Sequence, residues 1–254
     1  MKKQIILLAS VILGLGLLPV HAQMGPPGGG YGPNFGGATG KLFGENPSFT
    51  AVMELQTTDP SGNVVTMPGK ISLAAGKSRF EMNLTEMKGS KMPANASAQM
   101  AKMGLDRLIT VSRPDKNVSY AIYPGMNSYV ENKNTEATSH ADPADYKTET
   151  TELGRENVEG HPCAKNKVVV TDKDKVQHES TVWNATDLNN FPVKIQTREK
   201  TGDVIMQFKK ISLVKPDDSL FETPAGYTKY ESMQTMMQAE MMKKMGAGMG
   251  MPGQ

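Results

Sequence analysis

Cysteine is almost absent from this sequence. Cys163 is the single cysteine among 254 residues, so no disulfide can form within the chain. Small exported domains often depend on disulfides, whereas this chain must fold by burying apolar side chains, and its length is sufficient for that. We interpret Cys163 as a small buried apolar residue at the start of a strand, because free cysteine is among the most buried residue types.

The sequence also lacks the short motifs that carry catalytic or metal chemistry. It contains no HExxH, CxxC or GxSxG, the patterns typical of zinc hydrolases, redox dithiols and serine hydrolases. Asp172 and Asp174 lie in a turn whose spacing is too short for a calcium loop. The histidines stand apart from one another: His21, His140, His161 and His178. We therefore expect no enzyme and no cofactor, although a nucleophile and a base from distant segments could still meet in the fold.

Long apolar runs are missing everywhere except at the N-terminus. Lys2 and Lys3 precede an apolar run at residues 5–20, and Val20-His21-Ala22 is a small-x-small site. This pattern is typical of a secretory signal peptide cleaved after Ala22, and the run is shorter than the ~20 residues of a spanning helix. We expect residues 1–22 to be removed and the protein to be exported, to the periplasm of a Gram-negative envelope or beyond it.

After that cleavage the protein has no excess charge of either sign. Loss of Lys2 and Lys3 from the 28 basic residues leaves as many basic as acidic residues, of which there are 26. A neutral chain has no long-range field that would recruit nucleic acid or an anionic membrane. We therefore expect no nucleic-acid partner, and no transmembrane anchor remains after cleavage.

Residues 23–46 are rich in glycine and proline. This composition buries too little apolar surface to offset chain entropy, and it predicts a flexible linker. Gly40-Lys41 is followed by Leu42 rather than by serine or threonine, which excludes a phosphate-binding loop.

Apolar and polar residues alternate along much of residues 47–230. The clearest examples are residues 49–55 and 80–84, with turn signals such as DPSGN and AAGK between the apolar segments. Such alternation is typical of half-buried antiparallel strands. About ten strands joined by short turns predict a mainly β domain with little helix, as one large antiparallel sheet or an open barrel.

One helix interrupts the strands. The alanine-rich stretch after Pro93 predicts a helix from about Asn95 to Met103, with Asn95 as its N-cap and Gly104 just past its end. Met100 and Met103 would then share one face of this helix.

The second half of the chain carries a family resemblance. Its elements are a strand with Trp183, the approach from Leu188 to Pro192, a hairpin, and the closing pattern Phe221-x-x-Pro224-x-Gly226-Tyr227. With the earlier stretches GKSRFEM and LITVSRPDKNVSYAIYPGMNSYVE, these resemble exported bacterial proteins of unknown function related to the outer-membrane lipoprotein carriers LolA and LolB. The resemblance implies a strongly curved antiparallel sheet of about eleven strands, an unclosed barrel with helices across its mouth. In the carriers the concave apolar face holds acyl chains.

The resemblance implies that the helix near residues 95–103 is a lid. It also implies that some of the alternating apolar residues line a groove. Methionine suits such a site because its flexible thioether adapts to irregular apolar ligands, although the same alternation fits an ordinary core. The leading hypothesis is a non-enzymatic periplasmic protein that binds a lipid or another apolar ligand. The candidate ligand-binding residues are Met82, Leu84, Met100, Met103, Tyr120, Ile122, Trp183, Met206 and Phe208.

Residues 231–254 form a tail with many methionines and no leucine, isoleucine or valine. Residues 231–245 are compatible with a crude amphipathic helix that plugs the groove or binds an envelope protein partner. Thioethers also select Cu(I), which makes a soft-metal site the second hypothesis. A loose terminus is a further possibility for the tail. The third hypothesis for the protein is an envelope interaction module, in which the sheet is a scaffold and the linker and tail make the contacts. The candidate metal ligands are Met236, Met237, Met241, Met242 and Met245.

Overall fold

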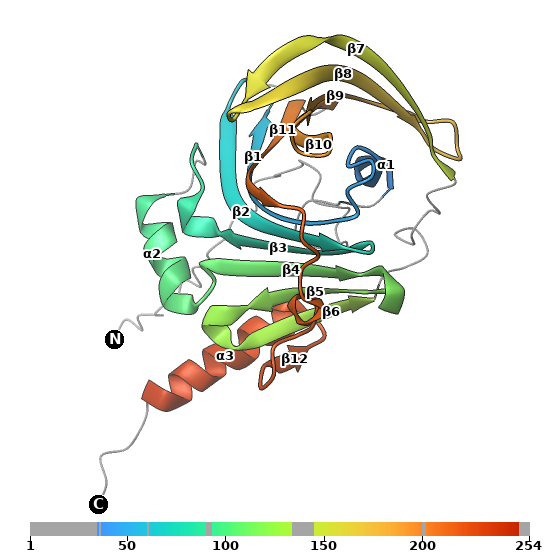
Figure 1. The fold of residues 1–254 in the computed structure, drawn as a ribbon. Helices are drawn as coiled ribbons and strands as arrows, with labels where there is room; N and C mark the ends of the chain where they lie inside the picture. The colour runs from blue at the N-terminus through green and yellow to red at the C-terminus, as the bar shows by residue number, and fades with distance from the viewer. Residues whose placement is uncertain are drawn as a thin grey trace, which may run out of the picture.

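The computed structural model describes residues 35, 37–59, 61–89, 93–133, 145–199 and 202–248. The predicted signal peptide, residues 1–22, lies outside the described residues. Twelve strands form one curved sheet in the order β12-β6-β5-β4-β3-β2-β1-β11-β10-β9-β8-β7 (Figure 1). The strands are β1 Ser48–Thr58, β2 Val64–Ala74, β3 Lys77–Asn83, β4 Arg107–Arg113, β5 Val118–Tyr123, β6 Ser128–Lys133, β7 Lys147–Val158, β8 His161–Thr171, β9 Gln177–Ala185, β10 Phe191–Glu199, β11 Gly202–Ser212 and β12 Thr228–Tyr230. The helices are α1 Gly37–Lys41, α2 Ala94–Met103 and α3 Met233–Gly248.

Every pairing is antiparallel except the short one between β12 and β6. The predicted mainly β fold with a curved, unclosed antiparallel sheet is therefore confirmed. Its twelfth strand exceeds the expected number because β12 has only three residues, Thr228–Tyr230, and pairs parallel with Ser128–Val130. A segment this short gives no alternation that sequence could reveal.

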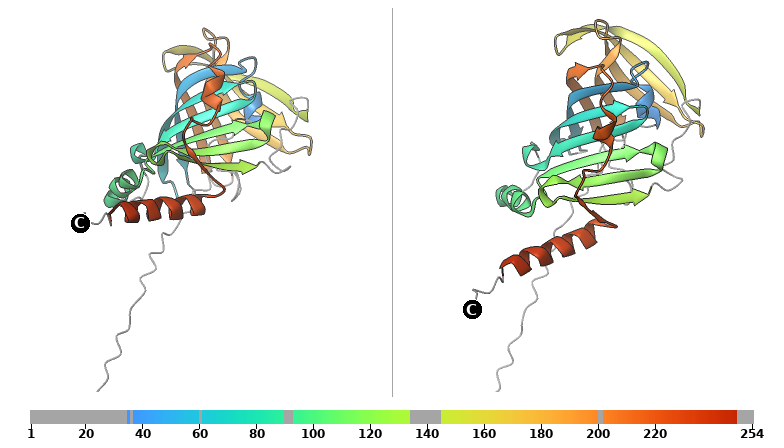
Figure 2. Two further views of the ribbon diagram at one scale, coloured as in Figure 1. Left: turned by 90° about the horizontal axis from the view of Figure 1, so that it is seen from below. Right: turned by 60° about the horizontal axis from the view of Figure 1, so that its bottom comes forward.

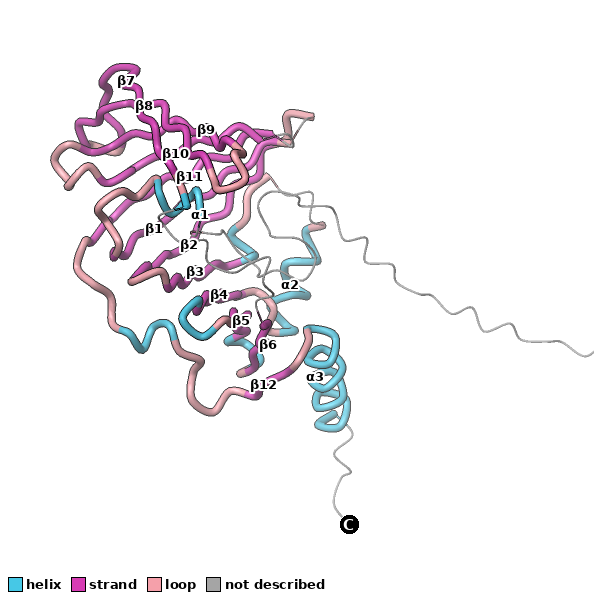
Figure 3. The backbone as a smooth tube through the Cα atoms, turned by 90° about the vertical axis from the view of Figure 1, so that its right-hand side faces the viewer, coloured by secondary structure: helices cyan, strands magenta, loops and turns pink. Residues whose placement is uncertain are grey.

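The two faces of the sheet are covered by different parts of the chain. The helices α2 and α3 lie on one side, and the segment that connects β11 to β12 runs along the other (Figure 3). Successive side chains of a strand point to opposite faces, and the buried apolar residues form two separate clusters, of which the smaller takes its strand residues from β2, β4, β5 and β6. We call the side with the helices the concave face and the other the convex face.

The connecting segment is held on the convex face by one buried aromatic ring and by arginines. Phe221, at the end of a short 3-10 helix Asp218–Phe221, is fully buried against Ile109, Val111 and Ile122. Arg79 donates to Leu220 O at 3.0 Å. The buried Arg113 donates to Phe221 O at 3.2 Å and pairs with Glu222. These contacts anchor the segment that leads to β12.

The predicted flexible linker is wrong for residues 35 and 37–46. Residues 37–41 form α1, and three large apolar side chains around that helix are buried: Phe35, Leu42 and Phe43. The prediction of a linker was based on the average composition of the segment, in which glycine outweighs these three apolar residues. They order the segment because they reach the core of the sheet.

The helix α2 confirms the expected helix to within one residue at its start. Pro93 precedes it without a side-chain cap, so Asn95 as the N-cap is wrong. Pro93 itself occupies the N-cap position, with φ −57° and ψ 143°, and it has no side-chain oxygen that could cap the first turn. Gly104 ends the helix with φ 78°, as expected for a left-handed C-cap. No helix in the described part of the chain is long and apolar enough to cross a membrane.

Candidate apolar binding face

One end of the concave face is built from phenylalanines. Phe43 lies against three rings from β1, β10 and β11, with centroid distances of 5.0 Å to Phe49, 5.9 Å to Phe191 and 5.7 Å to Phe208. Aromatic pairs at such distances add about 0.5–1.5 kcal/mol each beyond the burial of their surface. The rings therefore fix the segment before β1 onto the middle of the sheet.

Methionines are numerous among the other residues of the concave face. The register places Met53 opposite Gly69, and Gly69 opposite Met82, while Leu55 lies opposite both Met67 and Met206. Helices α2 and α3 add further methionines from above. In all, six buried and five partly buried methionines belong to this cluster: Met53, Met67, Met82, Met126, Met206 and Met236, and Met87, Met100, Met103, Met233 and Met237.

The convex cluster has a different composition. Among the described residues it is made of aliphatic and aromatic side chains, and it contains no methionine: Ala74, Ile109, Val111, Ile122 and Phe221, with Tyr120, Tyr129, Leu220 and Tyr227 at its border. The convex cluster is thus free of the flexible thioethers that the concave cluster contains.

The sequence-predicted ligand residues divide between these faces. Met82, Met206 and Phe208 are buried in the concave cluster, and Leu84, Met100 and Met103 are partly buried against it. Tyr120 and Ile122 belong to the convex cluster instead. Alternation alone does not tell which face of a strand is concave, and Ala121 and Tyr123 take the concave positions of β5.

Trp183 is a buried member of the concave cluster, and two lysines lie over its ring. Its register partners are Lys165 and Lys194, and their ammonium groups stand 5.0 Å and 4.4 Å from the centroid of its ring. Its indole N–H donates to Glu156. This bond, together with Lys165, lowers the pKa of the Glu156 carboxyl. The indole N–H of Trp183 thus has a protein partner, as a buried indole requires.

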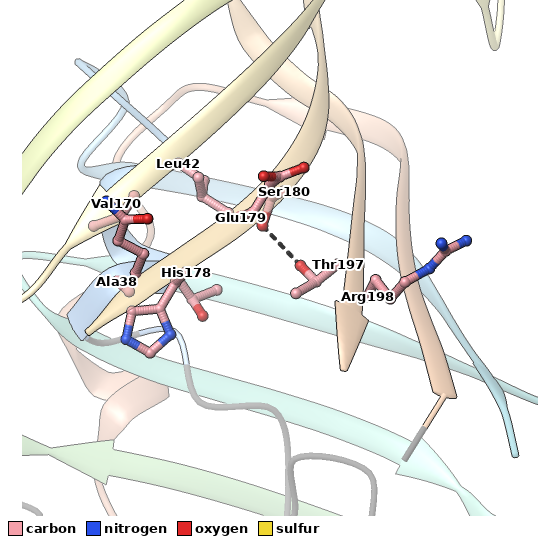
Figure 4. Close-up of a pocket in the computed structure, with 10 residues that line it drawn as sticks. Ala38, Leu42, Val170, His178, Glu179, Ser180, Thr197 and Arg198 are labelled. Carbon is pink, nitrogen blue, oxygen red and sulfur yellow. Dashed lines mark hydrogen bonds between the residues drawn. The ribbon is translucent and has the colours of Figure 1, made fainter. Parts of the chain in front are cut away.

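A cavity of about 290 Å³ opens between α1 and strands β8 to β10 (Figure 4). Ala38, Leu42 and Val170 give it an apolar side, and His178, Ser180 and Thr197 give it a polar side. Its size is at the lower limit of typical small-molecule sites.

The polar groups around this cavity do not form a hydrolytic site. The Ser180 hydroxyl shares a hydrogen bond of 2.8 Å with the Thr197 hydroxyl, while His178 Nε2 lies 3.4 Å from Asp172 Oδ2. Cys163 is buried, and burial raises the pKa of its thiol, which disfavours a thiolate nucleophile. The described residues hold no group of three His, Cys, Asp or Glu side chains suited to a metal ion.

The start of the tail is docked onto the domain. A reciprocal pair begins α3, because Thr235 N donates to Ser232 Oγ at 3.1 Å and Ser232 N donates to Thr235 Oγ1 at 3.2 Å. Met236 is fully buried, and Tyr123 Oη donates to Met233 Sδ at 3.8 Å. Figure 2 shows α3 leaving β12 and running along the β6 end of the sheet. A loose terminus is therefore the wrong interpretation for the first turns of α3.

The predicted metal ligands do not gather in one place. Met236 and Met237 pack toward the core, whereas Met241 and Met242 are 58% and 74% exposed. Met241 and Met242 are adjacent in a helix, so their side chains diverge by about 100°. The side chain of Met245 lies outside the described part of the chain. A soft-metal site in the tail stays a prediction.

Glu240 is an anchor of α3 that the sequence did not reveal. Its carboxylate accepts hydrogen bonds from Lys243 at 2.7 Å, Tyr230 at 3.1 Å and Ser128 at 3.3 Å. In sequence Glu240 only interrupts a methionine stripe. Its partners on β6 and β12 become visible only once the chain has folded.

Acid should release α3. The bonds from Lys243 first, and then from Tyr230 and Ser128, hold the pKa of Glu240 below its ordinary value of 4.5. Because the pKa of Glu240 is lower in the folded state than in the unfolded state, the docking of α3 contributes its full stability above the ordinary pKa of 4.5. This stability is lost as the pH falls through the lowered pKa of the folded state. We expect the ¹³C-methyl NMR signal of Met236 to move to the position of an exposed methionine on acidification, before that of Met53 in the sheet.

Glu240→Gln is the control for this pH dependence. Glutamine keeps the shape but not the charge, so the Met236 signal should already be partly shifted at neutral pH and should lose its early acid transition. An unchanged acid transition in this variant would assign the effect to another group.

The fold and this face together define a class: a curved-sheet protein with a rigid convex core and a methionine-rich concave face. The sequence matches the family described as Domain of unknown function (DUF4412) over residues 49–191 and 182–227. This match covers well over half of the chain, and the protein belongs to that family, which confirms the predicted family of unknown function. No match to a curated protein is found.

Several solved structures are similar to this chain. A LolA superfamily protein from Nitrosomonas europaea has 10% identity over 72% of this chain and 93% of its own, with a TM-score of 0.36. The lipoprotein LppX of Mycobacterium tuberculosis has 10% identity over 66% and 88%, with a TM-score of 0.37. A DUF1329 family protein from Desulfovibrio piger has 12% identity over 72% and 92%, with a TM-score of 0.32.

Proposed function

We propose that this protein binds a lipid or another apolar ligand on the concave face of its sheet, as a non-enzymatic binding protein of the periplasm. The observation that carries the proposal is the distribution of methionine. Eleven methionines belong to the concave cluster, and the described convex cluster has none. A core that needs only stability has no reason to confine methionine to one face, because leucine and isoleucine pack with better-defined rotamers.

The concave face is also covered in a way that suits a ligand site. Its cover consists of three separate pieces, α1, α2 and α3, instead of a second sheet. Each piece brings flexible or short side chains onto the strands, and Met100 and Met103 of α2 are only partly buried there. Thioethers can repack around an entering acyl chain at low cost, since they have three rotatable bonds and no branch.

Native mass spectrometry of the mature protein, purified from its own envelope without refolding, tests the proposal. We expect an added mass of several hundred daltons that is lost on mild activation and is identified as a lipid. A bare chain that also fails to bind oleate in titration would contradict the proposal. Protein adducts in crosslinking would then favour an envelope protein partner.

A pair of variants tests which face binds. Met103→Gln introduces an amide on the concave side, and we expect it to weaken oleate binding about tenfold, which corresponds to about 1.4 kcal/mol. Tyr120→Gln is the matched control, because Tyr120 is equally half-buried but lies on the convex face. Its oleate affinity should equal that of the unchanged protein. Equal losses in both variants would contradict a concave site.

A further inference from the structure

The segment before β1 occupies the part of the concave face nearest the cavity. We call residues 35 and 37–45 the plug. Phe43 is 2% exposed and sits among the rings of Phe49, Phe191 and Phe208, while Phe35 packs against Phe43 with a centroid distance of 6.1 Å. These two rings and Leu42 fill space that would otherwise be an open apolar surface of β1, β10 and β11.

The plug has little stability of its own. Its helix α1 has five residues, two of them glycines, and none of them is buried. Gly37 has φ +58°, and a side chain there would meet the Tyr146 hydroxyl at 3.0 Å. A helix this short and glycine-rich does not persist without tertiary contacts. The plug is therefore held by the residues that flank α1 and not by the helix.

A small polar clasp closes the plug at its C-terminal end. Asn46 is buried, and its Nδ2 donates to Phe43 O at 3.1 Å and to Asn189 O at 3.2 Å. Asn189 Nδ2 returns a bond of 3.1 Å to Asn46 Oδ1. The bonds between Asn46 and Asn189 tie the root of β1 to the turn between β9 and β10. Asn46 can therefore stay in place when the plug leaves the rings and only its bond to Phe43 O breaks.

The packing beneath the plug is incomplete. The cavity of about 290 Å³ has Ala38, Thr39 and Leu42 of the plug as one wall and Val170, Ser180 and Thr197 of the sheet as another. Leu42 of the plug is one of the apolar residues that line this cavity (Figure 4). Empty space at the border of the plug gives a ligand a starting point for displacement.

We propose that the plug occupies the binding site of a single acyl chain, and that the ligand and the plug exclude each other. This inference rests on the proposed function and adds its regulation. In the closed state Phe35, Leu42 and Phe43 shield the phenylalanine end of the concave face. In the bound state the acyl chain lies along Phe49, Phe191 and Phe208, and residues 35–43 are released toward solvent.

Trypsin cleavage after Lys41 reports the position of the plug. Lys41 is the last residue of α1 and is half-buried in the closed state, whereas Lys173 and Lys175, in the exposed turn between β8 and β9, serve as the reference. We expect saturating oleate to accelerate cleavage after Lys41 about fivefold or more, because cleavage follows the population of the open state. Cleavage in the β8–β9 turn should keep its rate.

Two matched substitutions separate displacement from general loosening. Phe43→Leu weakens the plug, and we expect about tenfold tighter oleate binding, since the affinity scales with the fraction of chains that are open. Phe221→Leu removes an equally buried ring from the convex face and should leave oleate affinity unchanged. Thermal unfolding of both variants verifies that each is folded during the titrations.

The outcomes distinguish this inference from the proposed function. Oleate binding with unchanged cleavage after Lys41 would overturn the plug and leave the proposed function standing. Binding by Phe43→Leu alone, with none by the unchanged protein, would support a plug that closes the site. Absence of binding in both would overturn the proposed function and the plug with it. Equal gains from Phe43→Leu and Phe221→Leu would also overturn the plug.

Discussion

Replacing Phe208 with alanine should lower the free energy of unfolding by about 3–5 kcal/mol, as expected for a fully buried aromatic side chain. Phe208 has no exposed surface and lies within 5.7–6.2 Å, between ring centroids, of three other phenylalanines. Alanine at this position leaves a cavity at the junction of β1, β10 and β11. Because domains are stable by only about 5–15 kcal/mol, the loss is a large part of the total.

Urea denaturation followed by Trp183 fluorescence measures this loss. Trp183 is the single tryptophan, and it lies two strands away from Phe208 under Lys165 and Lys194, so the substitution leaves its surroundings intact. Phe208→Leu is the control. Its free energy of unfolding should fall much less, since leucine keeps most of the side-chain volume. A loss below about 1 kcal/mol for Phe208→Ala would mean that the rings do not hold this end of the sheet together.

Gly104→Ala should have the second large effect, because two separate constraints meet at this glycine. Its φ of +78° is costly for any residue with a side chain, by about 1–2 kcal/mol. A Cβ atom would also lie 2.5 Å from the carbonyl oxygen of Gly125. Backbone cannot yield as a side chain can, so α2 must move away from the turn between β5 and β6. We expect a total loss of about 2–4 kcal/mol.

Gly226→Ala separates the two contributions. Gly226 has the same φ of +78°, but a Cβ atom added there meets nothing within 4 Å. Its free energy of unfolding should fall by only about 1–2 kcal/mol, the cost of placing a residue with a side chain at this φ. The difference between the two variants in urea denaturation measures the close approach of Gly104 and Gly125. Equal losses would show that α2 adjusts freely, and the proposed lid would then not be fixed at this end.

The sequence was sufficient to predict those strands and helices that a pattern within their own residues reveals. Alternation at residues 49–55 and 80–84 predicted β1 and β3, and the alanine-rich run before Gly104 predicted α2. Such patterns arise because a strand or helix must place its apolar side chains on one side. They hold without any knowledge of the partner that covers that side.

The candidate site depended on information that local patterns do not contain. Tyr120 and Ile122 alternate as regularly as Met82 and Leu84, yet they face the convex side. Which face is concave is decided by the curvature of the whole sheet. Phe35 and Phe43 were missed for a different reason, because glycine-rich neighbours give no periodicity, although two aromatic residues in such a segment were a usable signal.

The pairing of β1 with β11 also has a consequence for the order in which the sheet forms. Strand β1, residues 48–58, pairs on one side with β2, which follows it directly in sequence. On its other side it pairs with β11, residues 202–212. A growing chain therefore holds one edge of β1 unpaired until almost all of it has been synthesised. Contacts this distant in sequence form slowly. The centre of the sheet, where β1 meets β11, is thus closed only after the consecutive strands on either side of it have been synthesised.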